Sequence, residues 1–139
     1  MDPSESQIAE DALAFARANR KRIARELTDK SIYQEEAEPV SVFMAGSPGA
    51  GKTEASIELI ERFPEWRILR IDPDELRERI PDFRGGNAWL FQRAVSPLVD
   101  AVLDEAFRRR LSFVLDGTFA SYEVARKNVQ RSLSAGRPV

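Results

Sequence analysis

One segment of the sequence constrains the fold more than any other, because it matches the pattern G-x-x-x-x-G-K-[ST] at every fixed position. The segment reads Gly46-Ser47-Pro48-Gly49-Ala50-Gly51-Lys52-Thr53. Its glycines let the backbone curl so that several N–H groups face inward, and these donors bind oxyanions together with the N-terminus of the following helix. The motif therefore predicts a phosphate-binding loop between a buried strand and a helix.

The residues on either side of this loop agree with that arrangement. Val40 to Ala45 is a nearly continuous apolar run, typical of a buried strand in a parallel sheet, and Lys52 to Phe63 has the pattern of a helix. Two more short apolar runs, Trp66 to Ile71 and Leu111 to Leu115, are predicted as strands. Because strands and helices alternate, we expect an α/β fold of the P-loop NTPase type, with a parallel sheet flanked by helices.

Four further helices complete the predicted fold. They cover Ile8 to about Asp29, Pro73 to Ile80, Asn87 to about Arg110, and Ser121 to Ala135. Asn87 and Ser121 are expected to cap the N-termini of their helices, and Gly136 the C-terminus of the last one. Pro97 is expected to kink the long helix that begins near Asn87. We interpret residues 1–38 as an N-terminal helical segment and residues 39–139 as the core that carries the loop.

The composition excludes several classes of chemistry. The chain has no cysteine and no histidine, so disulfides, zinc fingers, thiol nucleophiles and histidine bases cannot occur, and a general base must be Asp, Glu, Lys or Tyr. A net charge of -2 argues against a general nucleic-acid binder. The first residues lack the features of a secretory signal, and the apolar runs are too short to span a membrane. A cytoplasmic location is therefore expected.

The phosphate loop also predicts its ligands. Lys52 should reach the β- and γ-phosphates of a nucleotide, and the Thr53 hydroxyl should bind Mg²⁺. The alternative is an ordinary glycine loop, but an apolar strand before the motif and a helix after it favour the functional interpretation. We therefore expect ATP with Mg²⁺ as the cofactor, bound by all eight residues of the motif.

Acidic residues follow the second and third predicted strands. Asp74 could take the proton from an attacking hydroxyl, as a general base must, while Asp72 and Asp74 could also favour the start of the helix at Pro73. Asp116 ends the third strand, where an acid of the Walker-B type binds Mg²⁺ or holds the acceptor. The alternative is a turn aspartate beside Gly117.

Other charged residues have simpler interpretations on spacing alone. Asp104 belongs to a solvated helix face, and the triplet Arg108-Arg109-Arg110 complements the C-terminal dipole of its helix. The basic face of the first helix is either solvated or a surface for a partner.

With these residues in place, the sequence resembles the zeta-toxin family of bacterial toxin–antitoxin systems over nearly its whole length. The resemblance rests on the order and spacing of several short motifs. They are Phe15-Ala16 with Asn19, the phosphate loop followed by Glu54, Ile71-Asp72-Pro73-Asp74, Pro81-Asp82-Phe83, Ser96-Pro97, Asp116-Gly117-Thr118 and Ala125-Arg126-Lys127-Asn128.

The resemblance implies a P-loop kinase that phosphorylates the 3′-hydroxyl of UDP-N-acetylglucosamine and so starves cell-wall synthesis. By that resemblance Asp74 is the catalytic base, with Asp72 beside it in the substrate site. Asp104 helps to bind the sugar nucleotide, as do Asp116 and Thr118. A later polar contact to the substrate is expected from Asn128, which lies in the final helix.

The resemblance also implies an antitoxin that packs on the N-terminal helix and blocks the nucleotide site. The family's sheet continues beyond the point that corresponds to Val139, with arginines that clamp the triphosphate and the substrate. We therefore expect a core that is incomplete at its C-terminus, in which binding survives better than catalysis. Two alternatives stay open: a P-loop kinase with another acceptor, and an inactive nucleotide-binding or protein-interaction module.

Overall fold

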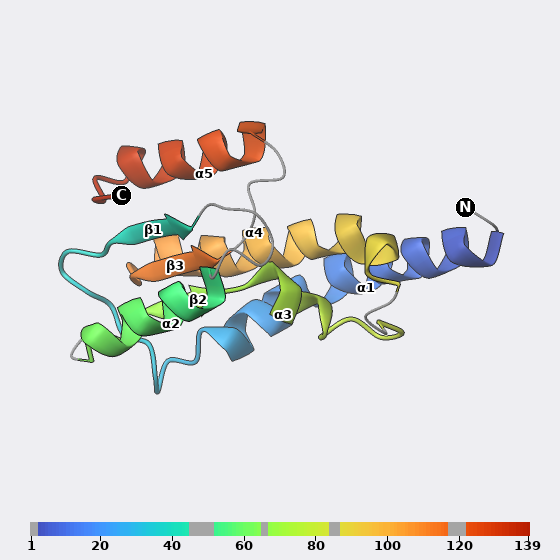
Figure 1. Cartoon of the computed structure of the whole chain (residues 1–139), viewed down its shortest axis with the longest axis horizontal. Coiled ribbons are helices and arrows are strands. Elements are labelled where there is room, and N and C mark those ends of the chain that lie inside the picture. Colours follow the sequence, from blue (N-terminus) through green and yellow to red (C-terminus); the bar gives the residue numbers. More distant parts are fainter. Residues whose placement is uncertain (1–2, 45–51, 65–66, 84–86, 117–121) are drawn as a thin grey trace. The chain divides into compact units, whose positions relative to one another are not determined.

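The computed structural model (Figure 1) describes residues 3–44, 52–64, 67–83, 87–116 and 122–139. These residues form two compact units. One comprises Met1–Leu27 and Pro73–Glu105, and the other comprises Thr28–Asp72 and Ala106–Val139. In the described ranges, no helix has both the length and the apolar character needed to cross a bilayer.

The second unit is built on a three-stranded parallel sheet. Its strands are β1 (Ser41–Met44), β2 (Leu69–Ile71) and β3 (Phe113–Asp116), in the order β1-β3-β2 (Figure 1). The predicted parallel sheet is therefore confirmed. The third strand begins later than predicted, because the N–H of Leu111 bonds instead to the carbonyl of Ala106 at the end of the preceding helix.

The register of the sheet sorts its side chains onto two faces. Leu69 and Ser41 lie beside Phe113, whereas Arg70 and Val42 lie beside Val114. Since successive side chains of a strand point to opposite faces, the first group shares one face and the second group shares the other. Asp116 lies two residues after Val114 and therefore belongs to the face of Arg70.

A helix packs on each face of this sheet. Helix α2 (Lys52–Arg62) covers the face of Arg70, because its Ser56 bonds to side chains there. Helix α5 (Tyr122–Ser134) borders the other face, where the hydroxyl of Ser132 donates to the hydroxyl of Ser41 at 2.9 Å. After α5 the carbonyl of Pro138 accepts a bond from the N–H of Ser41, so the chain runs along the second edge of β1.

Helix α5 ends as the sequence predicts. Gly136 has a φ of +74°, the left-handed conformation that glycine adopts without strain. The N–H of Gly136 bonds to the carbonyl of Leu133, and the N–H of Arg137 bonds to that of Ser132. This pair of bonds is a Schellman motif, and it confirms Gly136 as the C-cap residue.

Phe113 anchors the apolar face of the sheet beneath α5. Its ring meets Phe43 edge-on, with the centroids 5.7 Å apart, and meets Phe107 in the same way at 5.6 Å. The guanidinium of Arg137 lies 4.8 Å from the Phe107 centroid and is 5% exposed. Burial lowers the pKa of this guanidinium, and the neighbouring Arg110 adds to that effect.

The first unit contains helices α1 (Pro3–Leu27) and α3 (Pro73–Arg77) and most of α4 (Gln92–Arg108). A 3-10 turn, η1 (Ala88–Phe91), precedes α4. The predicted cap at Asn87 is wrong: its side chain makes no capping bond and instead donates to the carbonyl of Asp82 at 3.1 Å. The 3-10 turn seats Phe91, which is fully buried and meets the ring of Phe83 edge-on.

The C-terminal end of α4 is fixed by arginines that bind carbonyl groups. Arg110 adopts a φ of +55°, which costs a non-glycine residue about 1–2 kcal/mol. Its guanidinium donates to the carbonyls of Glu36 and Ala37, and its own carbonyl accepts the N–H of Glu36. These bonds compensate for the strain and hold the segment that leads into β1.

Arg137 provides a test of this end of the helix, since its guanidinium donates to the carbonyls of Leu111 at 2.6 Å and Ala106 at 2.9 Å. Arg137→Ala leaves both buried acceptors without these donors, so we expect a loss of about 3 kcal/mol in the free energy of unfolding. Urea denaturation followed by circular dichroism measures it. Arg126→Ala, at an exposed position of α5, should change stability by less than about 0.5 kcal/mol, and an equal loss in both variants would contradict this role.

Candidate functional site

The phosphate loop is framed as the motif requires. Strand β1 precedes it and helix α2 begins at Lys52, as predicted. The predicted ligands Gly46, Ser47, Pro48, Gly49, Ala50 and Gly51 lie outside the described residues. The backbone of Lys52 and Thr53 forms the first turn of α2, which places both residues where a phosphate-binding loop would need them.

The parallel sheet brings together the two acids that follow its strands. Arg70 joins them, because its Nη2 donates to Oδ2 of Asp72 at 3.0 Å and to Oδ2 of Asp116 at 2.5 Å. The side chains are 10% and 2% exposed for Asp72 and Asp116, and 13% exposed for Arg70. The structure therefore brings the acids that follow β2 and end β3 together, with a cation between them.

Ser56 ties helix α2 to the same cluster. Its hydroxyl donates to Oδ2 of Asp116 at 2.9 Å and accepts a bond from Nε of Arg70 at 2.9 Å. Ser56 lies one turn beyond Thr53 on α2 and is fully buried. The helix that follows the phosphate loop is thus bonded directly to the acid at the end of β3.

The charges of this cluster suit a divalent cation bound together with phosphate. Two carboxylates and one guanidinium sum to a formal charge of −1, counted over Arg70, Asp72 and Asp116. Within the described ranges, no group of three acidic side chains is arranged to hold a metal ion alone. Mg²⁺ usually takes only one or two protein carboxylates and completes its shell with water and substrate phosphates, so the residues present fit Mg²⁺ bound with a nucleotide.

Two other predicted site residues belong to the unit formed by residues 1–27 and 73–105. Asp74 lies in the first turn of α3, 77% exposed, and pairs with Arg77 one turn later. Asp104 is exposed on α4. The side chain of Asp74 is therefore largely exposed to solvent while it is ion-paired within α3.

Thr118 lies outside the described residues, and Asn128 is buried on α5. Among the described residues no partner is found for the buried Oδ1 of Asn128, whereas its carbonyl accepts the hydroxyl of Ser132 at 3.2 Å. Leaving a buried acceptor unbonded costs about 1–3 kcal/mol. Asn128 is not part of the cluster of Arg70, Asp72 and Asp116, because α5 borders the opposite face of the sheet.

Arg70 and Ser56 belong to the cluster but were not predicted from the sequence. A signal for Arg70 was present, since it lies between the apolar residues Leu69 and Ile71, two residues before Asp72, and could not be buried without an acidic partner. Ser56 carried a weaker signal, because serine is common on the first turns of helices. Its partner is found only once the strands are assembled.

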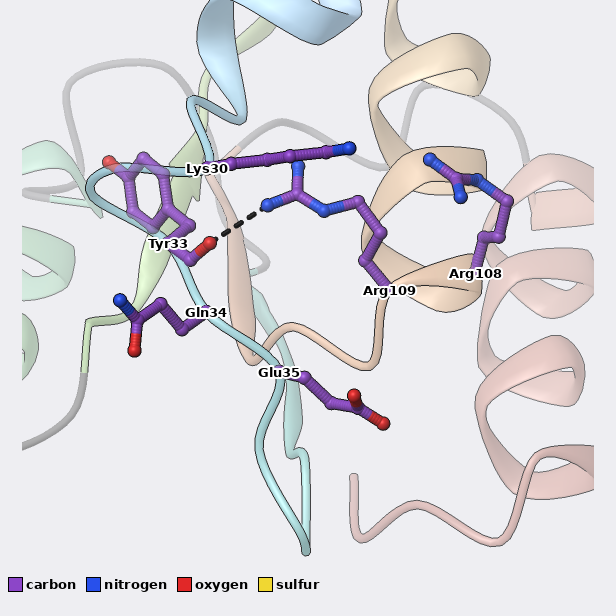
Figure 2. A pocket seen from close by; sticks show the side chains of 6 residues that line it. All are labelled: Lys30, Tyr33, Gln34, Glu35, Arg108 and Arg109. Atoms are coloured by element: carbon purple, nitrogen blue, oxygen red, sulfur yellow. Dashed lines mark hydrogen bonds between the residues drawn. The ribbon is translucent and has the colours of Figure 1, made fainter.

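A separate hollow lies at the C-terminal end of α4, in the unit that contains the sheet (Figure 2). It has a volume of about 370 Å³ and is lined by Lys30, Tyr33, Gln34, Glu35, Arg108 and Arg109. Arg109 donates to the carbonyls of Thr28 and Tyr33, the latter at 2.8 Å, and Glu35 pairs with Arg110 at 3.6 Å. These bonds tie the segment after α1 to the end of α4, so we interpret the basic lining as structural.

Comparison with known proteins adds to this geometry. The family described as zeta toxin matches residues 23–139. No curated protein matches the chain. A solved structure from the PezAT chromosomal toxin–antitoxin system of Streptococcus pneumoniae is similar with a TM-score of 0.71 and 20% identity, covering 99% of this chain and 55% of that one. The chain thus spans about half the length of the structure it matches, and at this identity the likeness shows the fold alone.

Asp116 tests the integrity of the cluster. Asp116→Ala removes the carboxylate that makes the shortest of the described hydrogen bonds to the buried Arg70. We therefore expect a loss of about 3 kcal/mol in the free energy of unfolding. Chemical denaturation measures the change. Glu61→Ala removes an exposed acid from α2 and should cost less than about 0.5 kcal/mol. If Asp116→Ala were as stable as the Glu61 variant, the bonds between Asp116, Arg70 and Ser56 would not form in solution.

Proposed function

Because the chain belongs to the zeta toxin family, we propose that it forms the nucleotide-binding part of a P-loop kinase. The proposed reaction transfers the γ-phosphoryl group of ATP to the 3′-hydroxyl of UDP-N-acetylglucosamine, a reaction that is toxic because it withdraws a precursor of the cell wall. One observation carries the proposal: the acid at the end of β3 is bonded to the helix that begins at Lys52 of the phosphate motif.

The proposed roles follow from position. Lys52 neutralises charge on the β- and γ-phosphates, and the hydroxyl of Thr53 together with the carboxylate of Asp116 holds Mg²⁺. The metal, when bound, offsets the negative charge of the phosphates. Asp72 lies at the edge of this site, bonded to Arg70.

The acceptor needs a base, and Asp74 is our candidate. Its side chain is 77% exposed and forms an ion pair with Arg77, which lies one turn later on α3. We propose that Asp74 accepts the proton of the attacking hydroxyl, and that Asp104, Thr118 and Asn128 contact the sugar nucleotide. The choice of acceptor rests on family membership rather than on a contact in the structure.

We further propose an antitoxin-type partner on α1. The outward face of this helix is basic, because Arg17, Arg20, Lys21 and Arg25 are all exposed. A surface of one charge sign attracts a partner of the opposite sign, so the partner would present acidic side chains. A cytoplasmic location agrees with the need for ATP and stays a prediction.

The kinase proposal is tested by ³¹P NMR of the chain with Mg²⁺, ATP and UDP-N-acetylglucosamine. We expect a new phosphomonoester signal, which Asp74→Asn lowers at least about 100-fold and Lys52→Ala abolishes. Glu61→Ala, on the exposed side of α2, serves as the control and should leave the signal unchanged.

The outcomes separate the alternatives. A signal that survives Asp74→Asn would exclude Asp74 as the base. Consumption of ATP with other hydroxyl acceptors, but not with UDP-N-acetylglucosamine, would show a kinase with a different acceptor. Nucleotide binding without turnover on any acceptor would identify a binding module.

A further inference from the structure

We propose that Arg70 is a positioning residue for the metal, which fixes Asp116 in the orientation that Mg²⁺–nucleotide requires. The inference rests on the proposed nucleotide site and adds a residue that the family motifs of the sequence analysis did not include. Arg70 touches neither phosphate nor metal in this proposal. It acts through Asp116.

Three elements meet at this one guanidinium. Nε of Arg70 donates to Ser56 on α2, and Nη2 donates to Asp72 after β2 and to Asp116 at the end of β3. Because guanidinium nitrogens lie in one plane at fixed angles, these bonds define where the three elements stand relative to one another. The cluster is buried, so water competes little for its bonds.

The bonds also select which oxygen of Asp116 faces a ligand. The hydroxyl of Ser56 and the guanidinium of Arg70 both donate to Oδ2. A carboxylate held at one oxygen presents its other oxygen in a fixed direction. Such outer partners of metal-binding side chains set the orientation of the ligand, and changing them typically weakens metal binding about 10–100-fold.

The charge of Arg70 is needed for the same purpose. Without it, Asp72 and Asp116 would be two negative groups sharing one buried site, and their mutual repulsion would drive the two carboxylates apart. With it, both carboxylates are held close to each other and to the phosphate helix. A lysine would supply the charge at a single point but not the two-nitrogen geometry, so charge alone should not suffice.

The proposal makes a prediction that a purely structural role does not. Phosphate binding by the loop backbone and Lys52 should not depend on Arg70, whereas the part of the affinity that comes from Mg²⁺ should. We therefore compare the affinity for a fluorescent ATP analogue with Mg²⁺ and with a chelator. In Arg70→Lys we expect metal-free affinity within about 2-fold of the unsubstituted chain, and a gain from Mg²⁺ that is about 10–100-fold smaller.

Two further variants keep the test decisive. Arg67→Lys makes the same replacement at an exposed position just before β2 and should match the unsubstituted chain in both conditions. Ser56→Ala removes one donor to Asp116 and leaves the charge of Arg70, so it should lower the gain from Mg²⁺ by a smaller factor. It carries the test if Arg70→Lys does not unfold cooperatively.

Equal gains from Mg²⁺ in Arg70→Lys and in the unsubstituted chain would overturn the proposal, as would a parallel fall of the metal-free affinity. If the unsubstituted chain shows the gain from Mg²⁺ but transfers phosphate to no acceptor, the proposed kinase function fails and the role of Arg70 stands. If the unsubstituted chain binds no nucleotide, or binds it without a gain from Mg²⁺, this inference falls.

Discussion

The structure depends on one buried ion pair more than on any other contact. Burying a carboxylate costs free energy unless it is paired and hydrogen-bonded, and Arg70 and Ser56 are such partners for Asp116, whose side chain is 2% exposed. These bonds join α2, β2 and β3 at the end of the sheet where β2 and β3 finish. Apolar residues could often fill such a position at lower cost, and the pair therefore agrees with the role proposed for Asp116 at the nucleotide site.

The opposite face of the sheet is stabilised by apolar contacts rather than by ion pairs. There the contacts are aromatic, with Phe113 between Phe43 and Phe107, and the cations that appear lie over rings or bond to carbonyls. This face therefore supports the sheet without carrying a cluster of acids. The division follows from strand alternation, which sends Arg70 and Asp116 to one side and Phe113 to the other.

Much of this organisation could be predicted from the sequence, because local patterns determine it. Apolar runs located β1, β2 and β3, aspartates marked the ends of the second and third of these runs, and Gly136 marked the end of α5. The errors arose where distant residues decide the outcome. Asparagine is a common N-cap residue, but the side chain of Asn87 donates to the carbonyl of Asp82 instead. The N–H of Leu111 bonds to the carbonyl of Ala106 near the end of α4, so β3 begins only after it. Arg70 and Ser56 are adjacent only in the assembled sheet.

The left-handed backbone conformation of Arg110 couples the opening of the end of α4 to that of the segment before β1. Its carbonyl and guanidinium bind the segment around Glu36, while the neighbouring N–H of Leu111 is held by Ala106. Breaking one of these bonds removes the compensation for the strained backbone and so weakens the others. The end of α4 and the segment before β1 should therefore exchange their amide hydrogens together, as a single cooperative unit rather than as a fraying helix end and a loose loop.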